Sequence, residues 1–147
     1  LKTIMKRLPA IGGSFNFNIN SKINYIEQDL QFRSKDINAI TFMNETYPRM
    51  SQKEIRTQLA KVGIKNDLAT KSIANLSGGE QVKIKLCALM QKESNILILD
   101  EPTNHLDVSA KEALFEALEV YDGAIILVSH EPMYAENLCT EIFDIEF

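Results

Sequence analysis

Apolar and polar residues follow two different patterns in the first part of the chain. Residues 1–8 carry apolar side chains at helical spacing, and a proline followed by a glycine pair predicts the end of that helix. Residues 14–19 and 23–26 instead alternate apolar with polar side chains, which is typical of half-buried strands. We therefore expect the tail of a helix followed by two short strands that pair in a sheet.

Helical spacing replaces this alternation in the middle of the chain. Helices are expected at 36–44 and 51–62. The second begins with Ser51, and Glu54 stands three residues later. These two residues can form a capping box, in which each side chain accepts a hydrogen bond from the other residue's backbone N–H group. Gly63 is expected to end this helix.

Helices and strands alternate in the second half of the chain. The pattern predicts, in order, a helix at 78–91, a strand at 95–99, a helix at 109–120, a strand at 124–129, a helix at 131–138 and a strand at 141–145. Such alternation implies right-handed crossovers and a parallel sheet buried on both faces, which is an α/β fold. Ligands of such sheets bind at the carboxyl ends of the strands.

The helical middle divides the chain into two parts. We expect residues 1–28 and 92–147 to form a sheet-based core, and residues 29 to about 91 to form a helical subdomain inserted into it. A length of 147 residues fits one domain. The first residue is Leu1 rather than Met and no signal sequence follows, so we expect a piece of a longer protein.

Composition and charge narrow the class of protein. The chain is 45% hydrophobic and 24% charged, as globular proteins are. Its apolar runs at 96–99 and 124–128 are far shorter than the roughly 20 residues of a membrane-spanning helix. The net charge of −4 gives no general attraction to nucleic acid. Cys87 and Cys139 lack the spacing of a disulfide framework or zinc site, which favours a cytoplasmic location.

Two adjacent acids, Asp100 and Glu101, follow the strand predicted at 95–99. Carboxylates at the end of a buried strand are costly to desolvate unless a cation or hydrogen bonds compensate. Mg²⁺ would compensate, because the first carboxylate would hold the ion and the second would align and deprotonate a water that attacks a γ-phosphate. Taken alone, the two acids are equally consistent with an ordinary polar turn.

A glycine pair opens the helix predicted at 78–91. Ser77 precedes Gly78, Gly79 and Glu80, so unshielded N–H groups at the positive end of the helix dipole could receive a phosphate. The alternative is structural, with Ser77 as an ordinary N-cap and Glu80 as its capping-box partner.

His130 and Gln28 each follow a predicted strand. A neutral imidazole at position 130 can hydrogen-bond a phosphate oxygen and stabilise charge in a transition state. The Gln28 amide can ligate Mg²⁺ or orient water, and its place at the junction with the helical insert would couple movement of the insert to the site. Taken singly, these residues are more simply a structural histidine and a surface glutamine.

Three motifs together resemble those of a known family. They are Leu76-Ser77-Gly78-Gly79-Glu80-Gln81, Ile98-Leu99-Asp100-Glu101-Pro102-Thr103-Asn104-His105-Leu106-Asp107 and Val128-Ser129-His130. They resemble an ABC-type nucleotide-binding domain, and the run at 104–107 resembles the ABC-F subfamily of soluble ATPases that act on the ribosome. The resemblance covers nearly the whole chain. It implies a parallel-sheet, P-loop NTPase-like core with an inserted helical subdomain, truncated at the N-terminus.

The resemblance also implies two ligands, ATP and Mg²⁺, and a second nucleotide-binding domain placed head to tail. It gives each matching residue a role: Asp100 and Gln28 at the metal, Glu101 as catalytic base, His130 as switch histidine, Ser77, Gly78, Gly79 and Glu80 in the signature motif that contacts ATP on the opposite domain, and Asp107 in the loop crossing the dimer interface.

The phosphate-binding loop of that family is absent from the chain. No Gly-Lys-Ser or Gly-Lys-Thr occurs anywhere in it. The resemblance places residues 1–8 just after that loop. We therefore expect that these 147 residues alone neither bind ATP tightly nor hydrolyse it, whereas the intact parent is an ATPase.

Several hypotheses for the parent protein are open. The ABC-F resemblance implies action on the ribosome, as a translation factor or in antibiotic resistance. An ATPase subunit of a membrane transporter is the main alternative, although the run at 104–107 favours ABC-F. An SMC-like ATPase lobe ranks lower because residues 1–28 show no sustained heptads. A non-catalytic interaction module is a further alternative for the isolated chain.

Overall fold

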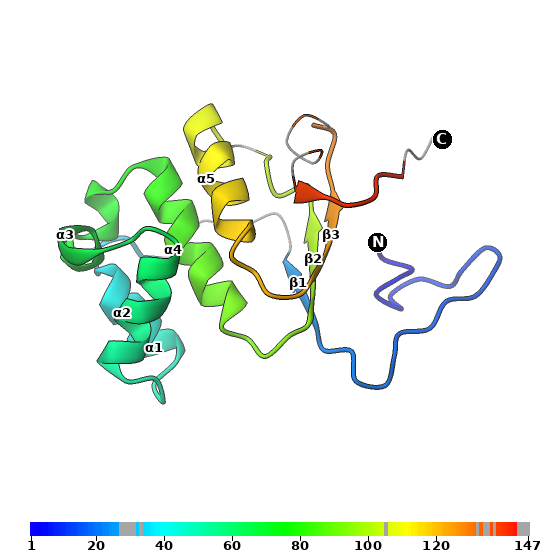
Figure 1. Cartoon of the computed structure of the whole chain (residues 1–147), viewed down its shortest axis with the longest axis horizontal. Coiled ribbons are helices and arrows are strands. Elements are labelled where there is room, and N and C mark those ends of the chain that lie inside the picture. The colour runs from blue at the N-terminus through cyan, green and yellow to red at the C-terminus, as the bar shows by residue number, and fades with distance from the viewer. Residues whose placement is uncertain are drawn as a thin grey trace.

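The computed structural model describes residues 1–26, 32, 34–104, 106–131, 133, 136 and 138–143. Its sheet has three parallel strands in the order β1 (Ile23–Ile26), β2 (Ile96–Asp100) and β3 (Ala124–Val128). The helices are gathered on one side of this sheet (Figure 1). The parallel α/β sheet predicted from the sequence is confirmed.

The central strand β2 is the most deeply buried of the three. Its register places Leu99 beside Ile26 of β1 and Asp100 beside Val128 of β3. The residues Leu97, Ile98 and Leu99 have no exposed surface, whereas Val128 on the edge strand is 37% exposed. Burial on both faces, predicted for the sheet as a whole, therefore holds for β2 and not for β3.

Six helical segments occur between residues 39 and 118 of the described part of the chain. They are α1 (Ala39–Thr46), α2 (Gln52–Lys61), α3 (Asn66–Thr70), η1 (Ile73–Asn75), α4 (Gly78–Met90) and α5 (Val108–Leu118). Helix α4 contacts α1, α2 and α5. The short helices α1, α2 and α3 lie on the side of α4 away from the sheet (Figure 1). Helix α4 thus joins the helical middle of the chain to the sheet region.

The elements predicted between residues 78 and 129 are confirmed to within two residues at each end. Side chains set several other boundaries. Ser51 and Glu54 form the predicted capping box at the start of α2, and Gly63, with φ of 83°, follows its end. The helix predicted at 36–44 starts later because the Asn38 side chain caps it by accepting a hydrogen bond from the first turn.

Two elements predicted near the N-terminus are wrong. Residues 1–8 form a hydrogen-bonded turn rather than a helix, because Lys6 adopts φ of 56° and leaves the helical path. Residues 14–19 form no strand. Ile19 at the end of this segment is 97% exposed, so its side chain is not buried as it would be on the core face of a half-buried strand.

The C-terminal predictions lie only partly within the described residues. Met133, Glu136 and Leu138 are helical, in agreement with the helix predicted at 131–138. Residues 141–143 are not in a strand, so the strand predicted at 141–145 is wrong for those positions. The remaining residues of that prediction lie outside the described part.

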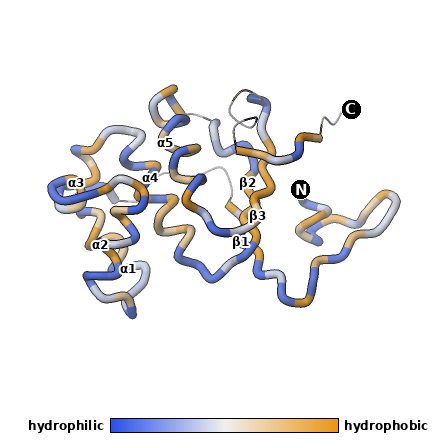
Figure 2. Tube along the Cα trace, in the orientation of Figure 1, coloured by the Kyte–Doolittle hydropathy of each residue, from blue (hydrophilic) through white to orange (hydrophobic). Residues whose placement is uncertain are grey.

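One apolar core joins the helices to the sheet. It contains residues from every layer, including Ile55, Leu59, Ile84, Leu86, Leu97, Leu99 and Leu114. Figure 2 shows apolar residues running along the strands, whereas apolar and polar residues alternate along the helices. Within the described residues, no helix is long and apolar enough to cross a membrane.

Candidate functional site

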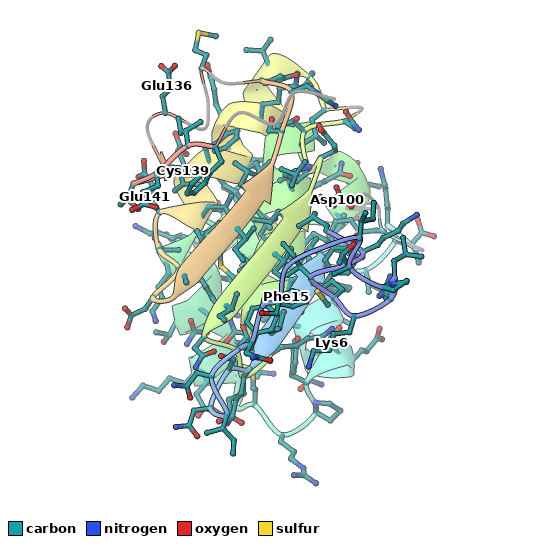
Figure 3. The ribbon with its side chains drawn as sticks, turned by 90° about the vertical axis from the view of Figure 1, so that its right-hand side faces the viewer. Lys6, Phe15, Asp100, Glu136, Cys139 and Glu141 are labelled. Carbon is teal, nitrogen blue, oxygen red and sulfur yellow. The ribbon has the colours of Figure 1, made fainter. Side chains whose placement is uncertain are left out.

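The adjacent acids lie at the carboxyl end of the central strand. Asp100 is the last residue of β2, and Glu101 begins the turn that follows. The Glu101 N–H group donates to the Val128 carbonyl of β3 at 2.9 Å, which ties this turn to the neighbouring strand. Figure 3 shows Asp100 at this end of the sheet. Both acids therefore lie at the edge where parallel sheets bind ligands.

The Asp100 carboxylate has a hydrogen-bond donor on the other neighbouring strand. Its Oδ2 atom accepts a hydrogen bond of 2.9 Å from the Tyr25 hydroxyl group of β1. Reasoning from the sequence missed Tyr25, because a tyrosine in an alternating strand is an ordinary packing residue. The signal that could have found it is register, since parallel pairing brings the ends of β1 and β2 together.

The structure brings Glu101 and His130 together. The Glu101 side chain is 12% exposed, and its Oε1 atom lies 3.1 Å from His130 Nε2. This contact lacks the alignment of a hydrogen bond, and Oε1 is buried without a hydrogen-bond partner among the described residues. A buried carboxylate oxygen without a donor is costly, so this atom is suited to a water or another donor supplied from outside the chain.

The backbone at Glu101 is strained. Its φ is 48°, in the left-handed region that non-glycine residues seldom adopt. This conformation costs roughly 1–2 kcal/mol for an ordinary residue. Strain of this kind concentrates at functional sites, where the surrounding structure holds the residue in place. The hydrogen bond from the Glu101 N–H to β3 is one such restraint.

The start of α4 is closed by a capping box. The Glu80 carboxylate accepts from the Ser77 N–H at 2.8 Å, and the Ser77 hydroxyl oxygen accepts from the Glu80 N–H at 3.3 Å. The structural alternative considered for this motif is therefore realised. The capping box still leaves groups that could contact a ligand, because the Ser77 hydroxyl can donate its own proton and Gly78 is exposed.

The two glycines of this motif have different surroundings. A Cβ atom on Gly79 would lie 3.0 Å from the Ala113 side chain and 3.2 Å from the Ser109 carbonyl oxygen, so this buried glycine lets α4 approach α5 closely. A Cβ on Gly78 would meet only the Asp107 carboxylate at 3.6 Å and a methyl group at 3.9 Å. Close packing thus explains Gly79 and leaves Gly78 without a packing role.

Asp107 brings the start of α5 to the same place. Its Oδ1 atom caps α5 by accepting from the Ala110 N–H at 2.7 Å, while Oδ2 faces the Gly78 position. Two helix starts, both exposed and both at the positive end of a helix dipole, therefore lie side by side. The structure thus joins Asp107 to Ser77 and Gly78, as one candidate surface.

An ion pair between Lys111 of α5 and Glu131 holds the segment next to His130. The Glu131 N–H also donates to the Ser129 hydroxyl at 3.0 Å. Sequence reasoning missed this pair, because neither residue belongs to a recognised motif. These contacts restrain Glu131, the residue directly after His130, so the backbone next to the imidazole is held in place.

The acidic edge fits a magnesium ion that is shared with a phosphate. The described residues contain no group of three or more His, Cys, Asp or Glu side chains that could enclose a metal. Mg²⁺ usually binds through one or two carboxylates together with phosphate oxygens and waters. Asp100, whose Oδ2 atom accepts from Tyr25, is suited to that mode as one such carboxylate. Gln28 and His105 lie outside the described residues.

Two cavities of the described residues lie elsewhere. One of about 430 Å³ is lined by residues of the first 15 positions, including Lys6 and Phe15. Another of about 550 Å³ includes Lys22 and Asn95, near the amino ends of β1 and β2. Neither cavity is lined by Asp100 or Glu101. The candidate site at the ends of the strands is therefore identified by its side chains and not by a cavity.

Comparison with known proteins identifies relatives of the chain. The family described as ABC transporter matches residues 1–104. The chain is 39% identical to the uncharacterized ABC transporter ATP-binding protein YfmM of Bacillus subtilis over 99% of its own length and 28% of that protein's. It is 34% identical to mouse ATP-binding cassette sub-family F member 3, over 97% of the chain and 20% of that protein.

A third relative extends the comparison to yeast. Protein GCN20 of Saccharomyces cerevisiae is 33% identical over 97% of the chain and 19% of its own length. The chain thus spans less than a third of each of these relatives. The sub-family F name agrees with the ABC-F resemblance of the motifs. Because the family match covers most of the chain, the chain belongs to the ABC transporter family.

Proposed function

We propose that the chain is part of an ABC-F ATP-binding domain and that the whole protein hydrolyses ATP with Mg²⁺. The observation that supports this most directly is the geometry at the end of β2, where a buried Glu101 oxygen without a donor lies 3.1 Å from His130. A carboxylate in this position can accept a proton from a water molecule. Glu101 is accordingly the proposed general base.

The neighbouring residues complete the proposed chemistry. Asp100 would hold Mg²⁺, with the Gln28 amide as a second ligand, and the bound ion would neutralise charge on the phosphate oxygens. His130 would hydrogen-bond a phosphate oxygen and stabilise the charge that develops there. Its imidazole is 93% exposed, so it is open to a ligand from outside the chain.

The surface formed by Ser77, Gly78, Gly79, Glu80 and Asp107 is the second part of the proposal. It would face ATP held by a second nucleotide-binding domain, arranged head to tail in the same protein or in a dimer. The exposed Gly78 between two converging helix starts supports this role, because backbone N–H groups there can bind an anion.

The division into subdomains remains a proposal as well. Residues 1–28 and 92–147 would form the sheet-based core, and residues 29 to about 91 would form the helical signature subdomain. The position of α1, α2 and α3 beyond α4 is consistent with that division.

A substitution of Glu101 tests the proposed hydrolysis. In the whole protein, Glu101→Gln should lower kcat for ATP by about 10²–10⁴-fold, because the amide cannot accept the proton. ATP binding should persist. The exposed Glu112 of α5 provides a matched control, and Glu112→Gln should leave kcat unchanged. Equal rates for Glu101→Gln and the unaltered protein would exclude Glu101 as the base.

The isolated chain gives a separate test. Because the 147 residues contain no Gly-Lys-Ser or Gly-Lys-Thr loop, they should neither bind ATP tightly nor hydrolyse it. Calorimetric titration of the chain with MgATP measures this. Micromolar affinity that depends on magnesium would contradict the expectation and would show that these 147 residues suffice for binding.

We propose the ribosome as the partner of the whole protein, in translation or in antibiotic resistance, on the basis of the run at 104–107. The alternative is an ATPase subunit of a membrane transporter, which the name of the Bacillus subtilis relative YfmM suggests. Affinity purification of the whole protein separates the two. Recovery of ribosomal subunits supports the first, and recovery of integral membrane proteins supports the second.

A further inference from the structure

Tyr25 and Asp100 meet on one face of the sheet. Tyr25 pairs with Ile98 in the register of β1 and β2, and side chains two positions apart on a strand share a face. The Tyr25 ring therefore lies on the same face as Asp100, and its hydroxyl donates to Asp100 Oδ2 at 2.9 Å. This contact links the edge strand directly to the residue proposed to hold the metal.

The two faces of β1 are both anchored. On the helix-covered face, the Asn24 side chain donates to the Leu89 carbonyl of α4 at 2.7 Å. On the other face, the Arg7 guanidinium lies 5.0 Å from the centre of the Tyr25 ring, a cation–π contact. Figure 3 shows the N-terminal segment, with Lys6 and Phe15, crossing in front of the sheet on this face. The Tyr25 ring is therefore held between the sheet and that segment.

We propose that Tyr25 is a positioning residue for Asp100. By occupying Oδ2, its hydroxyl fixes the rotation of the carboxylate and leaves Oδ1 to face the metal ion. This inference rests on the proposed function of Asp100 and adds to it a residue that none of the sequence motifs contains.

The physical reason is the strict geometry of magnesium coordination. Mg²⁺ requires nearly octahedral oxygen ligands at short distances, so a carboxylate that is free to rotate binds it less well. Hydrogen-bond partners that orient a metal ligand typically contribute about 10–100-fold to metal affinity. A hydrogen bond from a neutral donor to a charged carboxylate is also among the stronger kinds in proteins.

Tyr121 supplies a matched control at the other end of the sheet. Its hydroxyl group donates to the Ser94 carbonyl at 3.1 Å and lies 3.0 Å from the Ser94 hydroxyl oxygen, next to the start of β2. Tyr25→Phe and Tyr121→Phe therefore remove the same chemical group, a hydrogen-bonded hydroxyl near one end of β2. Only the first of these groups contacts Asp100.

The test measures metal binding without turnover. Mn²⁺ replaces Mg²⁺ as the probe, and its binding to the whole protein, loaded with a non-hydrolysable ATP analogue, is followed by electron paramagnetic resonance. Tyr25→Phe should raise the Mn²⁺ Kd by about 10-fold or more, whereas Tyr121→Phe should change it by less than about twofold. Both variants should remain folded with only a small loss of Tm, because each removes one hydroxyl group and leaves the aromatic ring in place.

Three results would overturn the inference or separate it from the proposed function. Equal Mn²⁺ affinities for the two tyrosine variants would remove Tyr25 from the positioning role. A Tm loss much larger for Tyr25→Phe than for Tyr121→Phe would show that Tyr25 stabilises the sheet instead. Asp100→Asn should weaken Mn²⁺ binding by more than Tyr25→Phe does, because it removes the carboxylate itself while the phosphates of the analogue remain. If Asp100→Asn weakens Mn²⁺ binding while Tyr25→Phe does not, only the positioning role of Tyr25 is excluded. If Asp100→Asn leaves the Mn²⁺ affinity unchanged, the proposed function of Asp100 as a metal ligand is itself contradicted.

Discussion

Two helices of this protein begin with the same hydrogen-bonded motif in different surroundings. Ser51 and Glu54 cap α2, and Ser77 and Glu80 cap α4, each pair with reciprocal side-chain to backbone bonds. At α2 the cap is exposed. At α4 the cap leads into a glycine pair that packs against the start of α5, with Asp107 facing Gly78.

The comparison separates what a capping box does from what a binding surface needs. The box satisfies backbone groups at either helix and requires no ligand to explain it. What distinguishes α4 is the exposed glycine beside a second helix start, together with the close approach that Gly79 permits. The hypothesis that this surface binds a ligand therefore rests on Gly78 and Asp107. The capping box supports neither that hypothesis nor its alternative.

The largest expected effect comes from filling the contact between α4 and α5. Gly79→Val should lower the free energy of unfolding by about 3 kcal/mol, because its side chain would collide with Ala113 and the Ser109 carbonyl. Urea denaturation measures this loss. A double-mutant cycle of Gly79→Ala with Ala113→Gly provides the control, since relieving the contact should give a favourable coupling. Purely additive effects would show that the helices separate freely.

Removal of each capping hydroxyl compares the two boxes directly. Ser51→Ala and Ser77→Ala should each lower the free energy of unfolding by about 1 kcal/mol, since each exposes an unsatisfied N–H group. In the whole protein only Ser77→Ala should also lower the ATPase rate. If both variants retained full activity, the α4 box would be structural only, as the α2 box is.

A smaller effect on folding is expected at the exposed glycine. Gly78→Ala places a methyl group in ordinary contact distance of its neighbours, so stability should rise by about 0.5 kcal/mol as helix entropy improves. The same methyl group would stand where an anion approaches the helix start. The ATPase rate of the whole protein should therefore fall while Tm does not, and an unchanged rate would argue against this surface.

The smallest expected effect is the pH dependence of the α2 box. Hydrogen bonds from the Ser51 hydroxyl and N–H groups hold the pKa of the Glu54 carboxyl below its usual 4.5. A lowered pKa in the native state gives stability that is present above the unfolded value and is lost as pH falls through the folded value. Glu54→Gln should thus flatten the acid limb of a plot of Tm against pH. An identical limb in both proteins would contradict the assignment.

The sequence was most predictive where local chemistry and packing agree. The elements from 78 to 129 were found because apolar periodicity, capping residues and glycines all indicate the same boundaries. Asp100 and Glu101 were placed at a strand end for the same reason. Residues 1–8 have helical spacing too, but the backbone of Lys6 leaves the helical path and the apolar side chains there are only partly buried.

The contacts that sequence reasoning missed all depend on register or on the pairing of distant segments. Tyr25 and Asp100 are brought together by strand pairing, and Lys111 and Glu131 by the packing of α5 beside the segment after β3. No local pattern encodes either contact. Gly79 illustrates the same limit, since its packing against Ala113 is a tertiary fact that a glycine motif cannot reveal.

The left-handed backbone at Glu101 has a consequence for protein engineering. Glycine or asparagine would occupy that conformation at lower cost, so a search for thermostable variants should replace this very glutamate. Such a variant would gain in melting temperature and lose the side chain that faces His130. Folding stability alone therefore does not explain a glutamate at position 101. A selection for thermal stability would be expected to replace it.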